Sequence, residues 1–216
     1  MKKLTKATAV LLCLLLLVGM MAGCGGSKEK EEGNTETEYG TVVIQNGDRT
    51  VTFTEMPKAV LCANLYSAEN MVMLGLGEYI VGKNVHTNPA EVPLEELADQ
   101  FVNIPEIDRS FENAVASGAD LLIGQVSAFK DTAWGTYEQL EESGINCLTI
   151  TGTIVSDETV EDIYTDIENL GKIFKCEDRA AALIQQMKES IAQTNAVVAN
   201  VPEEDMEFIV SFLKSL

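Results

Sequence analysis

The chain of 216 residues is predicted to be an α/β protein: an N-terminal β-hairpin, then a mainly parallel, Rossmann-like sheet flanked by helices, then a long connecting helix. Three patterns predict this class. Two β-rich stretches flank an Asn-Gly pair at 41–54, short apolar runs alternate with helical periodicity from residue 57, and a strong helical pattern covers 157–199. Alternating strands and helices are typical of βα units, whose strands pair in parallel.

The predicted elements follow one another in a regular order. The hairpin strands at 41–45 and 50–54 flank a turn at 46–49. Further strands are expected at 59–63, 79–82, 121–124 and 146–150, with helices between them at 67–76, 110–117 and about 132–143. Ser67 and Ser110 suit helix N-caps, and Gly77, Gly118 and Gly144 are placed to end the three helices.

Two amphipathic helices are predicted after residue 153. One face of the first is marked by Val160, Ile163, Tyr164, Ile167, Leu170, Ile173 and Phe174. The second runs from near Asp178 to about Val198, and its length of roughly 30 Å is enough to cross a small domain. Pro202 ends it, and 206–213 has the pattern of a further strand, so we expect the chain to be truncated at that point.

The first residues have the order of an export signal. Lysines at 2, 3 and 6 precede an apolar run at 9–18 that is too short to span a bilayer comfortably. Small residues then precede Cys24, an arrangement that resembles the bacterial lipobox. We predict a signal peptide at 1–23, lipidation of the Cys24 thiol and a flexible tether at 24–40; ordinary secretion with an incidental cysteine is the alternative.

Charge and cysteine content limit the class of function. A net charge of −19 argues against nucleic acid as a partner, because binding it requires a basic face. Beyond Cys24, the cysteines Cys62, Cys147 and Cys176 are widely spaced and form no CxxC unit, so no disulfide framework is predicted. We expect Cys62 and Cys147 to be buried in strands; a thiolate metal site is the alternative, although no histidine lies near either in sequence.

The order of these elements resembles the helical-backbone class, class III, of ABC-transporter solute-binding proteins, which includes iron-siderophore, haem and cobalamin binders. The resemblance lies in the segments 56–69, 74–82, 110–124 and 140–146 and in the helices at 157–199. Members usually have Lys-Pro-Asp before the third strand, where this chain has Ser117-Gly-Ala-Asp120. The resemblance implies an N-terminal ligand-binding lobe at 41–155, an interlobe connection at 156–199, and the start of a second lobe at 200–216, the rest of which is missing.

What the resemblance implies about function is specific. The protein would be lipid-anchored on the extracytoplasmic face of the cell membrane, monomeric and without a permanent cofactor. It would capture a metal chelate, namely a ferric siderophore, haem or cobalamin, and deliver it to an ABC permease and its ATPase. A sensor or adhesion lipoprotein and an inactive fragment are the alternatives. No enzyme is expected, because the sequence lacks a nucleophile elbow, a phosphate loop and a third glycine after Gly75 and Gly77.

Candidate ligand-binding residues follow from the rule that ligands of parallel sheets bind beyond the carboxyl ends of the strands. The rule selects the loops 64–67, 83–88, 125–127 and 151–153, and within them Tyr66, Ser67, Asn84, His86, Gln125, Ser127 and Thr151. Tyr66 offers a ring for stacking or a phenolate for iron, with plain packing as an equal alternative. Gln125 and Ser127 offer neutral hydrogen bonds, with loop capping as the alternative.

The remaining polar and aromatic candidates have more local interpretations. His86 is the only histidine and cannot build a zinc site alone, so we interpret it as a surface loop residue ahead of a ligand to a chelate. Trp134 and Tyr137 are expected on one helix, packed in the core. In the resembled family an acid in the helix at 110–117 pairs with arginine on the permease, which makes Glu112 a docking candidate; stabilisation of the helix dipole is the alternative.

Overall fold

The computed structural model describes residues 39–85 and 91–202. The predicted signal peptide, Cys24, nearly all of the predicted tether, His86 and the strand expected at 206–213 lie outside the described residues. Tyr39, which the sequence placed in the tether, is already part of the domain: its hydroxyl donates a hydrogen bond to the carbonyl of Ile173 at 2.7 Å.

The hairpin consists of β1 (Val42–Asn46) and β2 (Arg49–Phe53), paired antiparallel. Its register pairs Asn46 with Arg49, so the turn contains only Gly47, with φ of +64°, and Asp48. The prediction that Asn46 belongs to the turn was wrong. The Asn46 side chain is buried and donates to the Thr149 carbonyl and accepts from the Thr149 N–H, both at 2.7 Å.

A five-stranded parallel sheet follows, in the order β5-β4-β3-β6-β7. Its strands are β3 (Val60–Cys62), β4 (Ile80–Asn84), β5 (Glu106–Ile107), β6 (Leu121–Gly124) and β7 (Asn146–Thr149). Four of these confirm predicted strands, and all the pairs are parallel as expected. The short β5 was not predicted.

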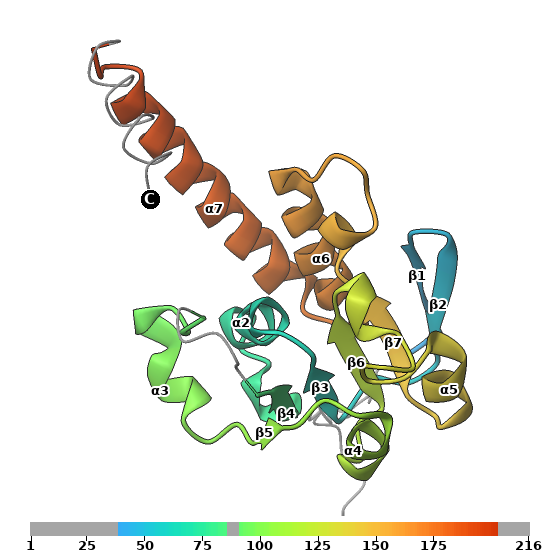
Figure 1. Ribbon diagram of the computed structural model, residues 1–216. Helices are drawn as coiled ribbons and strands as arrows, with labels where there is room; N and C mark the ends of the chain where they lie inside the picture. Colours follow the sequence, from blue (N-terminus) through green and yellow to red (C-terminus); the bar gives the residue numbers. More distant parts are fainter. Residues whose placement is uncertain (1–38, 86–90, 203–216) are drawn as a thin grey trace, which may run out of the picture. The chain divides into compact units, whose positions relative to one another are not determined.

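Helices connect and cover the strands. They are α2 (Leu65–Met73), α3 (Ala98–Phe101), α4 (Phe111–Ala116), α5 (Tyr137–Glu142), α6 (Val160–Ile173) and α7 (Glu177–Val198), with short 3₁₀ turns η1 (Gly77–Tyr79), η2 (Glu95–Leu97), η3 (Val126–Ala128) and η4 (Thr151–Thr153). The sheet lies between two groups of these helices (Figure 1). The described domain therefore has three layers.

Helix caps explain the boundaries that the sequence misplaced. Asn64, not Ser67, is the N-cap of α2, because its side-chain oxygen accepts from the Ser67 N–H at 3.0 Å. The same helix ends before Gly75, not Gly77; Gly75 has φ of +67°. The prediction of Ser110 as the N-cap of α4 is confirmed.

The helix expected at about 132–143 begins later than predicted. Gly135 has φ of +111°, and Thr136 caps α5 with a reciprocal capping box to Gln139. Trp134 therefore lies in the turn before α5 and not on the helix.

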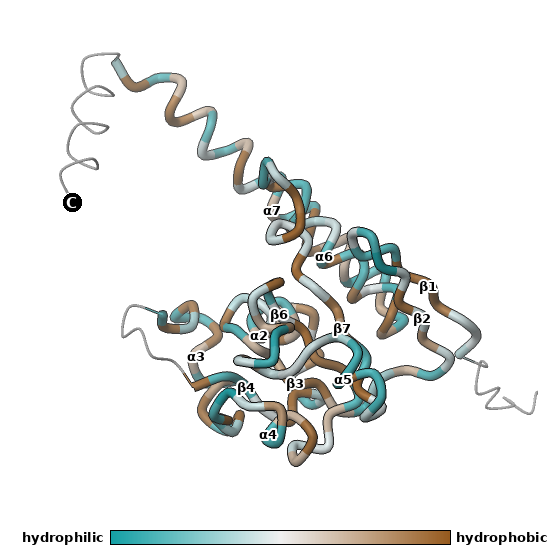
Figure 2. Tube along the Cα trace, turned by 45° about the vertical axis from the view of Figure 1, so that its right-hand side comes forward, coloured by the Kyte–Doolittle hydropathy of each residue, from teal (hydrophilic) through white to brown (hydrophobic). Residues whose placement is uncertain are grey.

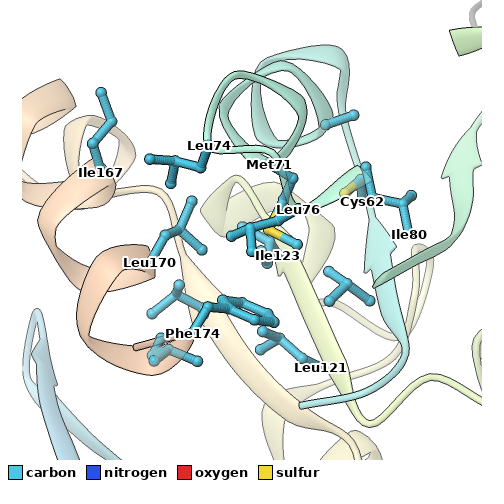
Figure 3. Packing of buried hydrophobic residues seen from close by; sticks show 14 of the residues in the cluster. Cys62, Met71, Leu74, Leu76, Ile80, Leu121, Ile123, Ile167, Leu170 and Phe174 are labelled. Atoms are coloured by element: carbon cyan, nitrogen blue, oxygen red, sulfur yellow. The ribbon is translucent and has the colours of Figure 1, made fainter. Parts of the chain in front are cut away.

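Each face of the sheet has its own apolar core. On one face, Cys62, Leu121 and Ile123 pack with α2, α6, α7 and the hairpin. Figure 3 shows Ile167, Leu170 and Phe174 directed toward this cluster. On the other face, Leu61, Leu122 and Cys147 pack with residues of α4 and α5 and with Trp134. Because both faces of β3 and β6 are buried, every position of these two strands has an apolar residue.

The two C-terminal helices confirm their predicted pattern. Tyr164, Ile167, Leu170 and Ile173 of α6 are buried, and α7 is one unbroken helix. Hydrophilic and hydrophobic residues alternate along α7 (Figure 2), and its residues 188–198 are all exposed. None of the helices in 39–85 and 91–202 combines the length and the apolar character needed to cross a membrane.

The three cysteines of the described domain, Cys62, Cys147 and Cys176, are free and buried. Cys62 lies in β3 and Cys147 in β7, as predicted. Burial raises the pKa of both thiols to about 12, so they are protonated at neutral pH.

The paired hydrogen bonds of Asn46 generate a stability prediction. Replacing Asn46 with Ala leaves the buried Thr149 N–H and carbonyl without their partner, which should lower the free energy of unfolding by about 2 kcal/mol. Denaturant unfolding of the purified protein measures this loss. Thr52→Ala, at an exposed position of β2, is the control and should change stability by less than about 0.5 kcal/mol. Equal effects of the two substitutions would contradict the assigned role.

Candidate ligand-binding site

The site begins where the strand order reverses. In the sheet, β4 lies on one side of β3 and β6 lies on its other side. The loops that follow β3 and β6 therefore lead in opposite directions from the centre of the sheet. Asn64 follows β3, and Gln125 follows β6. Such a switch point at the carboxyl ends of parallel strands is where open α/β sheets bind ligands.

Close backbone packing holds these two loops together. The Ala63 N–H donates to the Ile123 carbonyl at 2.8 Å, which extends the pairing of β3 and β6 by one residue. A Cβ at Gly124 would lie 2.8 Å from the Cβ of Ala63 and 2.9 Å from that of Ala128. Glycine is therefore required at the end of β6 for the loops to approach this closely.

Two adjoining pockets open at this edge. The first, here called the strand-end groove, has a volume of about 440 Å³ and is lined in part by Asn64, Tyr66, Asn84, Arg109, Gln125 and Ser127. The second, the α6 pocket, has a volume of about 270 Å³ and is lined in part by Gly152, Thr153, Glu158, Asp162 and Asp166. Asn64, Tyr66 and Gln125 line both pockets. The strand-end groove has the size of a small-molecule site.

A buried carboxylate joins α6 to this edge of the sheet. Asp166 is 7 % exposed and accepts hydrogen bonds from the Thr151 N–H, the Thr151 hydroxyl and the Tyr66 hydroxyl. Burial raises the pKa of Asp166, while the hydrogen bonds from Thr151 and Tyr66 act in the opposite direction. Asp166, a residue of α6, therefore holds the hydroxyl of Tyr66 in place.

Tyr66 is held in its neutral form. Burial raises its pKa far above the ordinary value, and the nearby charge of Asp166 adds to the shift. Its hydroxyl donates to Asp166 at 3.2 Å. Tyr66 lines both pockets, and its hydroxyl is engaged with Asp166.

The structure brings four of the predicted binding residues to the strand-end groove, namely Tyr66, Asn84, Gln125 and Ser127. Ser67 lies elsewhere: it is 1 % exposed, and its hydroxyl donates to the Asn64 carbonyl. The hydroxyl of Thr151 is engaged with Asp166. His86 is outside the described residues.

Among the groove residues, Arg109 was missed and Asn64 misread in the sequence, whereas the core packing expected of Trp134 is confirmed. Arg109 follows the unpredicted strand β5, so the strand-end rule was not applied to its loop. Asn64 fell within a selected loop, but its capping role was assigned to Ser67. Trp134 was interpreted as a packing residue; it is fully buried in the core and also lines the groove.

Comparison with known proteins rests on structure, because neither a protein-family model nor a curated protein matches the chain. A periplasmic binding protein from Veillonella parvula aligns over 75 % of this chain and 54 % of its own, with 26 % identity and a TM-score of 0.66. An ABC-type Fe3+-hydroxamate transport system protein from Saccharomonospora viridis aligns over 70 % and 55 %, with 25 % identity and a TM-score of 0.56. The domain has the periplasmic-binding-protein fold.

Further neighbours share this fold at lower identity. The siderophore-binding protein BauB, solved with ferric iron and two molecules of acinetobactin, aligns over 76 % of this chain and 56 % of its own, at 18 % identity and a TM-score of 0.59. The chain spans about half the length of the periplasmic binding proteins that it matches. The class III resemblance stated from the sequence is borne out by these structural neighbours, which are named as binding or transport-system proteins.

The buried position of Asp166 predicts a pH dependence of stability. Because its pKa is raised in the folded protein, the native state holds this proton more tightly than the unfolded state between the ordinary aspartate pKa of about 3.9 and the raised value. The contribution of Asp166 to stability is therefore present at lower pH and is lost as the pH rises through that window.

Asp166→Asn removes this titration while keeping the side-chain shape. The free energy of unfolding of the protein with Asp166, minus that of the Asn variant, should decrease as the pH rises from about 3.5 to 7. Denaturant unfolding of both proteins at several pH values measures this difference. Glu168→Gln, an exposed change on α6, is the control and should not reproduce the trend. A relative gain in stability with rising pH would refute the sign of the shift.

Proposed function

We propose that the protein is the solute-binding component of an ABC importer and captures a metal chelate in the strand-end groove. The observation that supports this most directly is the position of Asn64, Tyr66 and Gln125, which line both pockets at the switch point of a periplasmic-binding-protein fold. Two of the structural neighbours are an Fe3+-hydroxamate transport protein and a ferric siderophore binder. A ferric siderophore is therefore the proposed ligand ahead of haem and cobalamin.

The groove chemistry agrees with a chelate as ligand. Its polar lining presents neutral amides and a hydroxyl from Asn64, Asn84, Gln125 and Ser127 beside the ring of Tyr66. A chelated iron already has its coordination positions filled, so the protein needs to bind the outer surface of the chelator and not the metal. Stacking on Tyr66 and hydrogen bonds from the amides supply such contacts.

The proposed cellular setting follows the same class of protein. Lipidation of Cys24 would hold the domain at the extracytoplasmic face of the membrane, and the permease with its ATPase would receive the ligand. Glu112 is the proposed docking residue, and its exposed position in the first turn of α4 is consistent with that role. An acid at this position would pair with a basic group on the permease.

Ligand titration tests the binding role. Trp134 is the only tryptophan of the chain and lines the groove, so its fluorescence should change saturably on addition of ferric siderophores, with micromolar or tighter affinity. Gln125→Ala should weaken binding about tenfold, because one hydrogen bond to the ligand is lost. Glu168→Gln should leave the affinity unchanged. If ferric hydroxamates, ferric catecholates, haem and cobalamin all fail to bind, the proposal is wrong and the chain is inert toward chelates.

Charge reversal tests docking separately from ligand capture. Glu112→Lys should lower uptake of the bound chelate several-fold in cells carrying the matching permease, because an interfacial charge pair mainly controls encounter and register. Ligand affinity of the purified protein should not change. Glu138→Lys, also in the first turn of a helix, is the matched control for the helix-dipole effect. Equal uptake by both variants would remove Glu112 from the interface.

A further inference from the structure

The two halves of α7 have different surroundings. In the first half, Ala180 and Ile184 are buried in the apolar core with residues of α6, and Met187 packs against that core. In the second half, every residue from 188 to 198 is exposed. Figure 1 shows this half projecting from the rest of the described domain. Because isolated helical segments this short are marginal in water, packing against another surface would stabilise it.

One face of α7 continues past the domain core with a regular repeat. Its residues follow one another at alternating steps of four and three: Ala180, Ile184, Met187, Ile191, Thr194 and Val198. This is the heptad spacing of the residues that two paired helices bury between them. Ile191 is 39 % exposed and Val198 is 41 % exposed, and neither belongs to an apolar cluster of residues 39–85 and 91–202. Ile191, Thr194 and Val198 are here called the α7 seam.

Thr194 fits this seam although it carries a hydroxyl group. The hydroxyl donates to the Ser190 carbonyl, one turn back along the helix, at 2.9 Å. A buried hydroxyl without such a bond would lower the stability of a contact. Because the donor is used within the helix, the methyl group of Thr194 can be buried beside Ile191 and Val198.

The second half of α7 carries no charge beyond its first residues. The chain has 34 acidic and 15 basic residues, yet none of them lies in 190–202. Asn195 and Val197, which flank the seam, are uncharged. In paired helices the charged residues at flanking positions select the partner, and like charges there repel. The flanks of the α7 seam therefore permit pairing with an identical helix.

The two charged residues at the start of this half are engaged with their own chain. The Lys188 ammonium lies 4.7 Å from the centre of the Tyr164 ring, and Glu189 accepts a hydrogen bond from Gln185 at 2.7 Å. With a net charge of −19, two copies of the chain repel each other over much of their surface. Because 190–202 is uncharged, this repulsion is weak at the α7 seam.

We infer that the α7 seam is a self-association surface, on which α7 of a second copy of the 216-residue chain packs antiparallel. Ile191 of each copy then lies opposite Val198 of the other, so the contact is the same for both copies. Antiparallel pairing separates the two acidic domains by about 20 Å of helix, which exceeds the screening length of about 8 Å. Parallel pairing would place the domains side by side. The association requires no ligand.

The contact is small, so the dimer should be weak. Three turns of helix from each copy bury less surface than the 1,600 Å², roughly, of a typical stable interface. Sedimentation velocity of the purified protein at several concentrations should show a monomer–dimer equilibrium with a Kd of about 10–100 μM. A single monomeric species at every concentration up to about 300 μM would overturn the inference.

A charge placed in the seam tests which face of α7 forms the contact. Ile191→Glu should weaken the dimer at least about tenfold, because the carboxylate would have to be buried without a partner. Ala196→Glu adds the same charge to the opposite, exposed face of the helix and is the matched control, with an unchanged Kd. Equal weakening by the two substitutions would overturn the assignment of the seam.

Mixing two variants tests the identity and the direction of the partner. Ile191→Lys and Val198→Glu should each be monomeric alone, because each dimer would bury unpaired charges. In an antiparallel heterodimer the lysine of the first variant lies against the glutamate of the second, so the mixture should dimerise about tenfold more tightly than either variant. A mixture that stays monomeric would overturn antiparallel pairing of two copies.

Other occupants of the seam give different results. If residues 203–216 of the same chain covered it, the protein would be monomeric, and Ile191→Glu would lower the thermal unfolding midpoint whereas Ala196→Glu would not. If only a different protein covered it, the protein would be monomeric and both variants would unfold like the unchanged chain. Either result overturns self-association. Circular dichroism of each variant shows whether a lost dimer reflects a lost fold.

Discussion

Parallel pairing of β3 with β6 is the constraint on which the site depends. The pairing sets Leu61 opposite Leu122 and Cys62 opposite Ile123, so that each face of the sheet receives apolar side chains. A shift of one residue would turn these side chains to the opposite faces and displace the loops that follow. Because Gly124 permits close approach to Ala63 at the strand ends, Asn64 and Gln125 line the same pockets although they are far apart in the sequence.

Two sets of hydrogen bonds connect other elements to this centre. Asn46 joins the hairpin to the end of β7 through Thr149, and Asp166 joins α6 to Thr151, which follows β7, and to Tyr66 of α2. The Asn46 hydrogen bonds are buried and those of Asp166 are partly buried, and an unpaired polar group is costly in such surroundings, so each connection favours one arrangement. The position of Tyr66 thus depends on α6, through the hydrogen bond from its hydroxyl to Asp166. A rigid groove wall reduces the ordering that a ligand must impose on binding.

Charge acts on two length scales in this protein. The net charge of −19 keeps the chain soluble, but fully solvated charges are screened beyond about 8 Å at physiological salt. Arg109, Glu69 and Glu91 line the same groove, so a ligand bound there meets charges of both signs at short range, whatever the net charge of the chain.

The sequence by itself determined the elements whose signals are local: the apolar face of α6, the unbroken α7, the bounds of β6 and the cap at Ser110. Periodicity and capping depend on neighbours within a few turns, so they can be read directly from the chain. Tertiary structure decided the contents of the groove. β5 has only two residues and no alternation, so Arg109 could not be placed before the sheet was known. The burial of Asn64 Nδ2 and Trp134 Nε1, which have no hydrogen-bond partner within 39–85 and 91–202, likewise arises only on folding.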